Sequence, residues 1–125
     1  MVSSPWLRIL VIQQLRGLWV ARGLEHDISI ENRSMERAID AVVGIAKAHS
    51  DFDQRHGRVA LSSLPAAPRW CWTAYQHATP LRTLPAPQPQ GPEGIVSEIS
   101  IAVAPDGWAL PVGSAIRQPS AIPAA

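Results

Sequence analysis

Two histidines and an aspartate recur along one predicted helix at spacings that could bring them together. His49, Asp53 and His56 follow one another by four and three residues, which is the repeat of a single helical face. Imidazole and carboxylate groups suit zinc, iron or manganese, so these side chains are candidate ligands for a divalent metal. The outer two would lie about 10 Å apart along the helix axis. One ion would therefore need a further ligand, which His26 or His77 could supply.

The same residues suggest a second chemistry, proton transfer. A histidine beside a carboxylate is the minimum for general acid–base catalysis, because the carboxylate fixes the imidazole tautomer. Asp53 and His56 are three residues apart on the helix. A third interpretation is that the segment is the solvated end of a helix, where Arg55 and His56 favour the helix dipole. Polar helix ends are common, so we favour this interpretation and keep the metal site as an alternative.

The helix that would carry these residues is clearly marked in the sequence. Ser34 is a good N-cap, Glu36 lies in the first turn where it favours the helix dipole, and Gly57 is a good stop signal. Between these ends, apolar residues recur every three or four positions, as in an amphipathic helix. They form a main row of Met35, Ile39, Val42 and Ala46 and a second row of Ala38, Ala41, Ile45, Ala48 and Phe52. The sequence therefore predicts a helix with a wide apolar face over residues 34–57.

Another helix is predicted near the start of the chain, over residues 5–22. Ser4 followed by Pro5 is a typical helix start. Apolar residues lie all round this segment, so such a helix needs burial on more than one side, against other elements or another subunit. Trp6 and Trp19 lie on it and are candidate partner-binding residues.

The charge of this segment leaves two further interpretations open. Residues 1–24 contain three arginines and no acidic residue, which is typical of a targeting presequence and also of a helix that lies on a membrane surface. A secretory signal or a membrane-spanning helix is not favoured, because Gln13, Gln14 and Arg16 interrupt the apolar run. We favour a folded helix and keep the membrane surface as an alternative.

Strand signals follow in three places. Alternating apolar and polar residues predict a short strand at residues 24–31, and residues 58–64 are compatible with another. Residues 95–103 also alternate, and a Pro-Asp-Gly turn at residues 105–107 leads back into residues 108–112. The sequence therefore predicts a C-terminal β-hairpin. Its second strand contains a proline and so belongs at a sheet edge.

Proline distinguishes the second half of the chain from the first. Eleven of the twelve prolines lie at or after position 65, which disfavours long helices there. Residues 79–94 resemble a proline-rich surface linker, partly in polyproline II conformation, and residues 113–125 a loose tail. Residues 69–78 fit strand spacing and helix spacing equally, so their structure is left open.

Composition limits the functional classes. A chain of 125 residues supports one domain, over residues 1–125. Its net charge of +1 gives no electrostatic argument for binding nucleic acid. Cys71 is the single cysteine, so no internal disulfide can form and a reducing cytoplasm is the default location. Cys71 with His77 could form a nucleophilic pair, but a buried structural thiol is the commoner case.

Together these patterns predict an α+β fold in which two helices pack on a small, partly antiparallel sheet with a C-terminal β-hairpin. No recognised catalytic motif is present. We therefore expect a non-enzymatic protein-interaction or assembly subunit, which binds a protein partner or a second copy through its apolar helix, an edge strand and the proline-rich segment. Trp6, Trp19 and Trp108 would be its partner-binding residues. No cofactor is expected, unless the His49, Asp53 and His56 set binds a divalent metal as part of a small metal-dependent enzyme.

Overall fold

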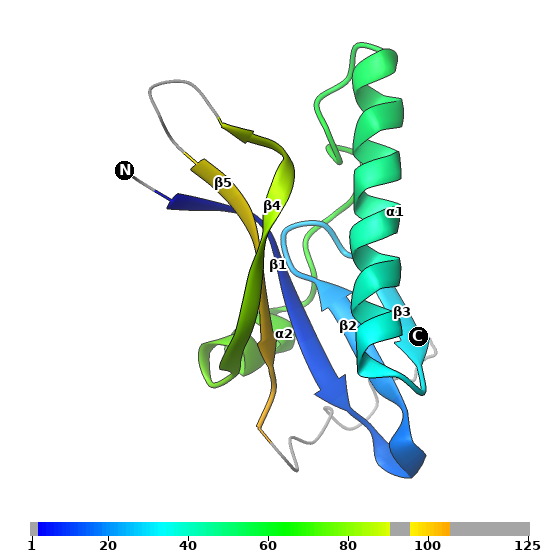
Figure 1. The fold of residues 1–125 in the computed structure, drawn as a ribbon, viewed down its shortest axis with the longest axis vertical. Coiled ribbons are helices and arrows are strands. Elements are labelled where there is room, and N and C mark those ends of the chain that lie inside the picture. Colours follow the sequence, from blue (N-terminus) through cyan, green and yellow to red (C-terminus); the bar gives the residue numbers. More distant parts are fainter. Residues whose placement is uncertain (1–2, 91–95, 106–125) are drawn as a thin grey trace.

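The computed structural model in Figure 1 describes residues 3–90 and 96–105. These described residues form an α+β arrangement of two α-helices on a five-stranded mixed sheet. The elements are β1 (Ser3–Gln13), β2 (Trp19–Gly23), β3 (Ser29–Asn32), α1 (Met35–Arg55), α2 (Arg69–Gln76), β4 (Thr79–Gln90) and β5 (Val96–Val103). The strand order is β3-β2-β1-β5-β4, with β1 parallel to β5 and the other neighbours antiparallel. The predicted class, two helices on a small and partly antiparallel sheet, is confirmed.

The helix predicted at residues 5–22 is wrong, because this segment forms two strands. β1 and β2 pair antiparallel, and a single turn of 3-10 helix at Leu15–Gly17 joins them. Gly17 has a φ of +73° in this turn, a conformation that glycine adopts without strain. Gly17 is therefore the turn residue of a hairpin.

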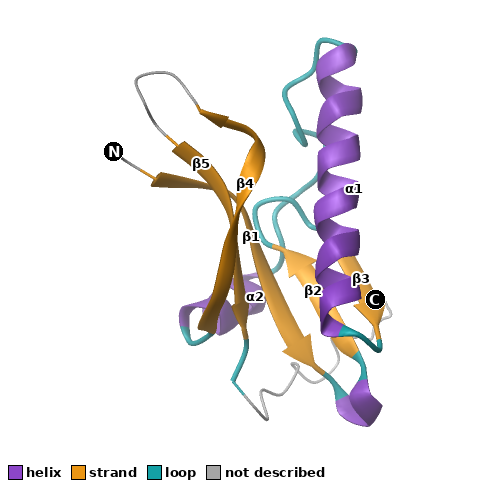
Figure 2. Ribbon diagram, in the orientation of Figure 1, coloured by secondary structure: helices purple, strands orange, loops and turns teal. Residues whose placement is uncertain are grey.

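The all-round apolar pattern of this segment reflects burial of β1 on both faces. Leu7, Ile9 and Val11 belong to a core under α1. Leu10 and Ile12 point to the opposite face, where they pack with residues of α2. A central strand covered on both sides is a near-continuous apolar run, which sequence periodicity does not separate from a buried helix. Figure 2 shows α1 and α2 on opposite sides of the sheet.

The predicted helix over residues 34–57 is confirmed as α1. The Ser34 side chain accepts the backbone N–H of Arg37 at 3.2 Å, as an N-cap should. Glu36 lies in the first turn, and Gly57 follows the helix with a φ of +71°. Ile39, Val42 and Ala46 of the main apolar row are buried against β1, β2 and β3, and the partly buried Met35 packs against the same core.

Three short segments differ from the sequence patterns in detail. The strand predicted at residues 24–31 begins later, because the chain turns after β2 before it enters β3. Residues 58–64 form turns rather than a strand. The open case at residues 69–78 is settled as helix α2. In α2 the positions that alternate as in a strand, Trp70 and Trp72, flank the buried Cys71.

The segment predicted as a proline-rich linker at residues 79–94 is largely an edge strand. Residues 79–90 form β4, which pairs antiparallel with β5 and has breaks in register near its prolines. Proline has no backbone N–H to donate to a neighbouring strand, so a sheet tolerates it on an edge strand, where one side of the ladder is unpaired. The extended backbone was predicted correctly, but its pairing was not. Residues 91–94 lie outside the described residues.

The C-terminal hairpin is confirmed only in its first strand. β5 covers most of the alternating segment, and its described neighbours are β1 and β4. The predicted return strand at residues 108–112 and the tail at residues 113–125 lie outside the described residues.

Candidate functional site

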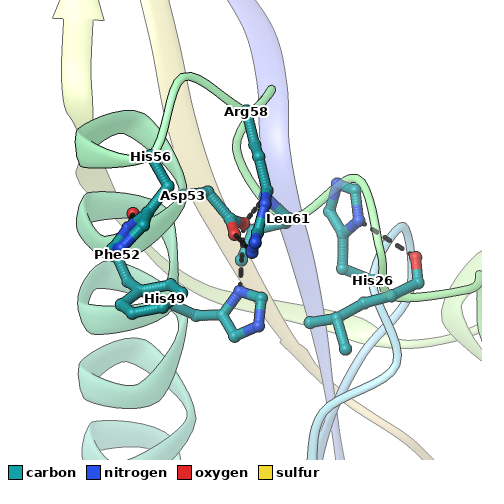
Figure 3. Close-up of polar contacts among 8 residues, drawn as sticks. His26, His49, Phe52, Asp53, His56, Arg58 and Leu61 are labelled. Carbon is teal, nitrogen blue, oxygen red and sulfur yellow. Dashed lines mark hydrogen bonds and ion pairs between the residues drawn. The ribbon is translucent and has the colours of Figure 1, made fainter.

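Asp53 is the centre of the predicted chemical site, and its side chain is only 2% exposed. His49 Nδ1 lies 3.1 Å from one carboxylate oxygen, and the backbone N–H of Leu61 donates to the same oxygen at 2.9 Å. A guanidinium nitrogen of Arg58 lies 3.8 Å from the other oxygen. Figure 3 shows these groups converging on the carboxylate from α1 and from the loop that follows it. Asp53 is therefore engaged by groups of its own chain.

His56 is not part of this cluster. It is the C-cap of α1, and its backbone φ of −103° departs from helical geometry, so its side chain leaves the row that periodicity predicts. Its ring packs on Phe52 with ring centroids 4.1 Å apart, and its Nδ1 lies 2.8 Å from the Phe52 carbonyl oxygen. Within residues 3–90 and 96–105, no three His, Cys, Asp or Glu side chains are grouped to hold a metal ion.

The contact that the structure does form is a histidine–carboxylate pair. A carboxylate at Nδ1 favours the tautomer with its proton on that nitrogen, which leaves Nε2 as the acceptor nitrogen of the neutral ring. The His49 side chain is 35% exposed, so the pair borders solvent. His26, one candidate for a further ligand, has its Nδ1 3.4 Å from the Leu64 carbonyl oxygen. The pair could move a proton, but its carboxylate also accepts the Leu61 N–H and so holds the loop after α1.

Two of the three candidate partner-binding tryptophans lie on strands, where the sequence predicted a helix. Trp6 is on β1, beside the break in register with β5, and Trp19 opens β2. Both are partly buried and pack against the core under α1, so they support the fold. Trp108 lies outside the described residues.

Two stacked ion pairs on the α2 side of the sheet were not predicted from the sequence. The Arg22 guanidinium donates to both carboxylate oxygens of Asp27, at 2.8 and 2.9 Å, and lies 5.6 Å from the ring centroid of Trp70. The equivalent stack on β1 has Arg8 bonded to Glu25 at 2.6 Å and 5.4 Å from the ring centroid of Trp72. The two tryptophans are two residues apart on α2, so the stacks fasten this short helix to the sheet.

Ionisation on this side follows from burial and pairing. The hydrogen bond to Asp27 raises the pKa of Arg22, so its guanidinium stays charged. Burial raises the pKa of the Cys71 thiol to about 12. A thiolate is the reactive form of cysteine, so this geometry favours a structural thiol over a nucleophile.

The second apolar row of α1 is partly uncovered along its outer side. Ile45 and Phe52 are 42% and 46% exposed, and the small Ala48 between them is also exposed. Ala41 is half-buried at the start of the row. We call Ala41, Ile45, Ala48 and Phe52 the outer row of α1. The spacing of these residues is visible in the sequence. Their exposure depends on the tertiary structure, because a different side of α1 packs on the sheet.

The outer row is bordered by further apolar and charged groups. Val59, just after α1, is 76% exposed. The Arg58 guanidinium lies 5.8 Å from the Phe52 ring centroid, and the His56 ring packs on the same Phe52 ring. Asp51 and Arg55 form a surface ion pair at 3.0 Å on the adjoining side of the helix. The structure thus presents apolar and charged groups together at this end of α1.

Comparison with protein-family models, with curated proteins and with solved structures found no match to this chain. Neither helix that the structure describes has both the length and the apolar character needed to cross a bilayer.

Proposed function

We propose that this chain is a non-enzymatic protein-interaction or assembly subunit that binds its partner through the outer row of α1. One observation carries the proposal. Ile45 and Phe52 leave nearly half of their surface in solvent, in one row with the exposed Ala48, on a helix whose main row is buried. Single exposed apolar residues are normal on a protein surface, whereas a row of them on one helix face indicates a contact surface.

The size of this surface sets the affinity it can supply. Complete burial of a side chain of this size contributes about 1.5–3 kcal/mol. Covering the exposed half of Ile45 and of Phe52 would therefore contribute roughly 1 kcal/mol each, or together about 30-fold in Kd. The partner needs additional polar contacts at the rim. Charged residues on the solvent-facing side of α1 offer them, namely Arg37, Asp40, Asp51 and Arg55.

The two sheet edges are less suited to a partner. β4 contains four prolines, whose missing N–H groups interrupt the ladder that an added strand would need. β3 is only four residues long, so an added strand would gain few hydrogen bonds. Packing on a helix face is therefore favoured over strand addition.

The alternatives from the sequence have less support. The membrane-surface interpretation required an exposed apolar helix at residues 5–22, whereas this segment contains core strands. The metal-dependent enzyme required three convergent ligands, whereas His49 and Asp53 meet without His56. Binding to a protein partner is still supported, because α1 has an exposed apolar face.

The proposal is tested by charging one residue of the outer row. Light scattering on the eluting protein gives its association state, and fluorescence of an apolar dye reports exposed apolar surface. Ile45→Arg should abolish association or dye binding and keep the native circular dichroism spectrum. Gln54→Arg adds the same charge at an exposed position elsewhere on α1 and should leave both readouts unchanged. A wild-type chain that is folded, monomeric and does not bind the dye would overturn the proposal.

A further inference from the structure

Gly44, on the same helix as the outer row of α1, is the position that we expect to accommodate the Phe52 side chain of a second copy. Gly44 lies four residues before Ala48, and Phe52 lies four residues after it. A two-fold axis beside Ala48 would bring Phe52 of one copy opposite Gly44 of the other, and the reverse. We propose that two copies of this chain pair through antiparallel α1 helices about such an axis. This inference rests on the proposed function and names its partner.

The described fold of one copy does not require a glycine at position 44. Gly44 lies within α1 and is exposed, and a Cβ atom placed on it would meet no atom within 4 Å. A glycine inside a helix is less favourable than an alanine, because it orders a more flexible backbone. On a helix–helix interface, however, it leaves a depression into which a bulky side chain can pack. Phe52, whose side chain is 46% exposed, has the size to fill it.

The charges beside the row favour the antiparallel arrangement. Asp40 is exposed, and Arg55 bonds Asp51 in a pair whose side chains are 69% and 65% exposed. About the axis at Ala48, Asp40 of each copy lies beside Arg55 of the other, so opposite charges meet twice. A parallel pair would instead set Asp40 against Asp40 and Phe52 against Phe52, with like charges close together and no depression for either ring.

The length of the contact predicts a reversible dimer. The antiparallel overlap centred on Ala48 spans residues 41–55, which is about 22 Å of helix. A contact of this length falls at the small end of specific protein interfaces. The dimer should therefore dissociate on dilution, and its population should depend on protein concentration.

Disulfide cross-linking at the two-fold axis tests the pairing directly. A disulfide requires Cα atoms about 4.4–6.8 Å apart, so position 48 can cross-link to its own copy only where Ala48 lies at the contact between the two helices. A parallel pair would also bring Ala41 beside its own copy, whereas the antiparallel pair sets Ala41 beside Arg55, so Ala41→Cys should not cross-link. Ala48→Cys should cross-link into a covalent dimer under mild oxidation at least tenfold faster than Lys47→Cys, which is exposed on another side of the same helix. The native Cys71 is fully buried and does not compete. Equal rates for the two variants would overturn the pairing.

A second variant separates docking from folding. Gly44→Leu fills the proposed depression and improves helix propensity. It should weaken dimerisation at least tenfold without lowering the thermal unfolding temperature of the monomer. Undiminished dimerisation would overturn the pairing.

The failure of this inference can be distinguished from the failure of the proposed function. A dimer that Ile45→Arg disrupts, but that Ala48→Cys does not cross-link, would refute the antiparallel pairing and support the outer row as a contact surface. A monomer that binds the apolar dye through the outer row would refute self-pairing and leave a different protein as the partner. A monomer without dye binding would refute both.

Discussion

The Asp53 carboxylate accepts the backbone N–H of Leu61 at 2.9 Å and thereby holds Leu61 at a φ of +61°. Residues other than glycine seldom adopt this left-handed conformation, because Cβ approaches the following carbonyl oxygen. The Leu61 side chain is fully buried in the core under α1, so burial of the side chain offsets the backbone cost. Asp53 is thus the anchor that ties the loop after α1 to the hydrophobic core.

Replacement of this anchor should destabilise the fold. We expect Asp53→Ala to lower the free energy of unfolding by about 2–3 kcal/mol, since it leaves the buried Leu61 N–H without its acceptor. Urea unfolding followed by circular dichroism measures the change. Asp51→Ala, which removes an exposed ion pair with Arg55, should cost no more than about 0.5 kcal/mol. Equal losses for the two variants would contradict the anchoring role.

The stacked ion pair of Arg22 should distinguish arginine from lysine. An ammonium group cannot donate in parallel to both oxygens of Asp27 while its charge stays over the Trp70 ring, as the guanidinium does at 5.6 Å from the ring centroid. Arg22→Lys should therefore lower the free energy of unfolding by about 1 kcal/mol, although the charge is kept. Arg37→Lys, at an exposed position on α1, is the matched control and should change little in the same chemical denaturation experiment.

The buried thiol of Cys71 should make stability fall at alkaline pH. Burial raises its pKa from 9.0 to about 12. Between these values the unfolded chain releases a proton that the folded chain retains, so the free energy of unfolding decreases as pH rises through this window. Urea unfolding at pH 8 and pH 10.5 should show a loss of about 2 kcal/mol from this group. Cys71→Ala should reduce that pH dependence; an unchanged dependence would contradict the assignment.

The ion pair between α1 and β4 should be visible in an acid titration. Arg82 donates to the Glu36 carboxylate, at 2.7 Å for one of its two bonds, and this holds the pKa of Glu36 below its ordinary value of 4.5. Stability from a lowered carboxyl pKa is present above the ordinary pKa and is lost as pH falls through the folded value. Arg82→Gln should raise the pKa of Glu36 in a carbon-detected NMR titration. Arg69→Gln, on α2, should leave it unchanged.

The features that the sequence predicts correctly are those set by local chemistry. Ser34 and Gly57 mark the ends of α1 because a side-chain acceptor and a left-handed residue act within one turn of the helix. The wide apolar face of α1 follows from spacing alone. The alternation in β5 is local in the same way.

The prediction failed at the start of the chain because local and tertiary causes give the same pattern there. An apolar residue at nearly every position of residues 6–12 fits either a buried helix or a strand covered on two faces. Ser4 and Pro5 added a helix-start signal, although proline is equally at home early in a strand. Only the presence of α1 on one face and α2 on the other makes β1 a central strand.

The candidate site also contains contacts that local spacing predicts and contacts that depend on the tertiary structure. Periodicity correctly places His49 and Asp53 within hydrogen-bonding distance, because four residues make about one helical turn. It fails for His56, because the helix ends one residue earlier. The stacks of Arg8 and Arg22 on α2 join residues about 50 positions or more apart, and a single sequence has no local signal for such a contact.

The sequence by itself determined the position and caps of α1, the apolar rows along it, the extended backbone of residues 79–90 and the α+β class. Each of these depends on interactions between residues a few positions apart. The tertiary structure alone decided that residues 3–23 are a hairpin, that the proline-rich segment is an edge strand, and that Ile45, Ala48 and Phe52 of the second apolar row of α1 stay exposed. Burial and strand pairing decide these features, because both depend on which distant segments meet.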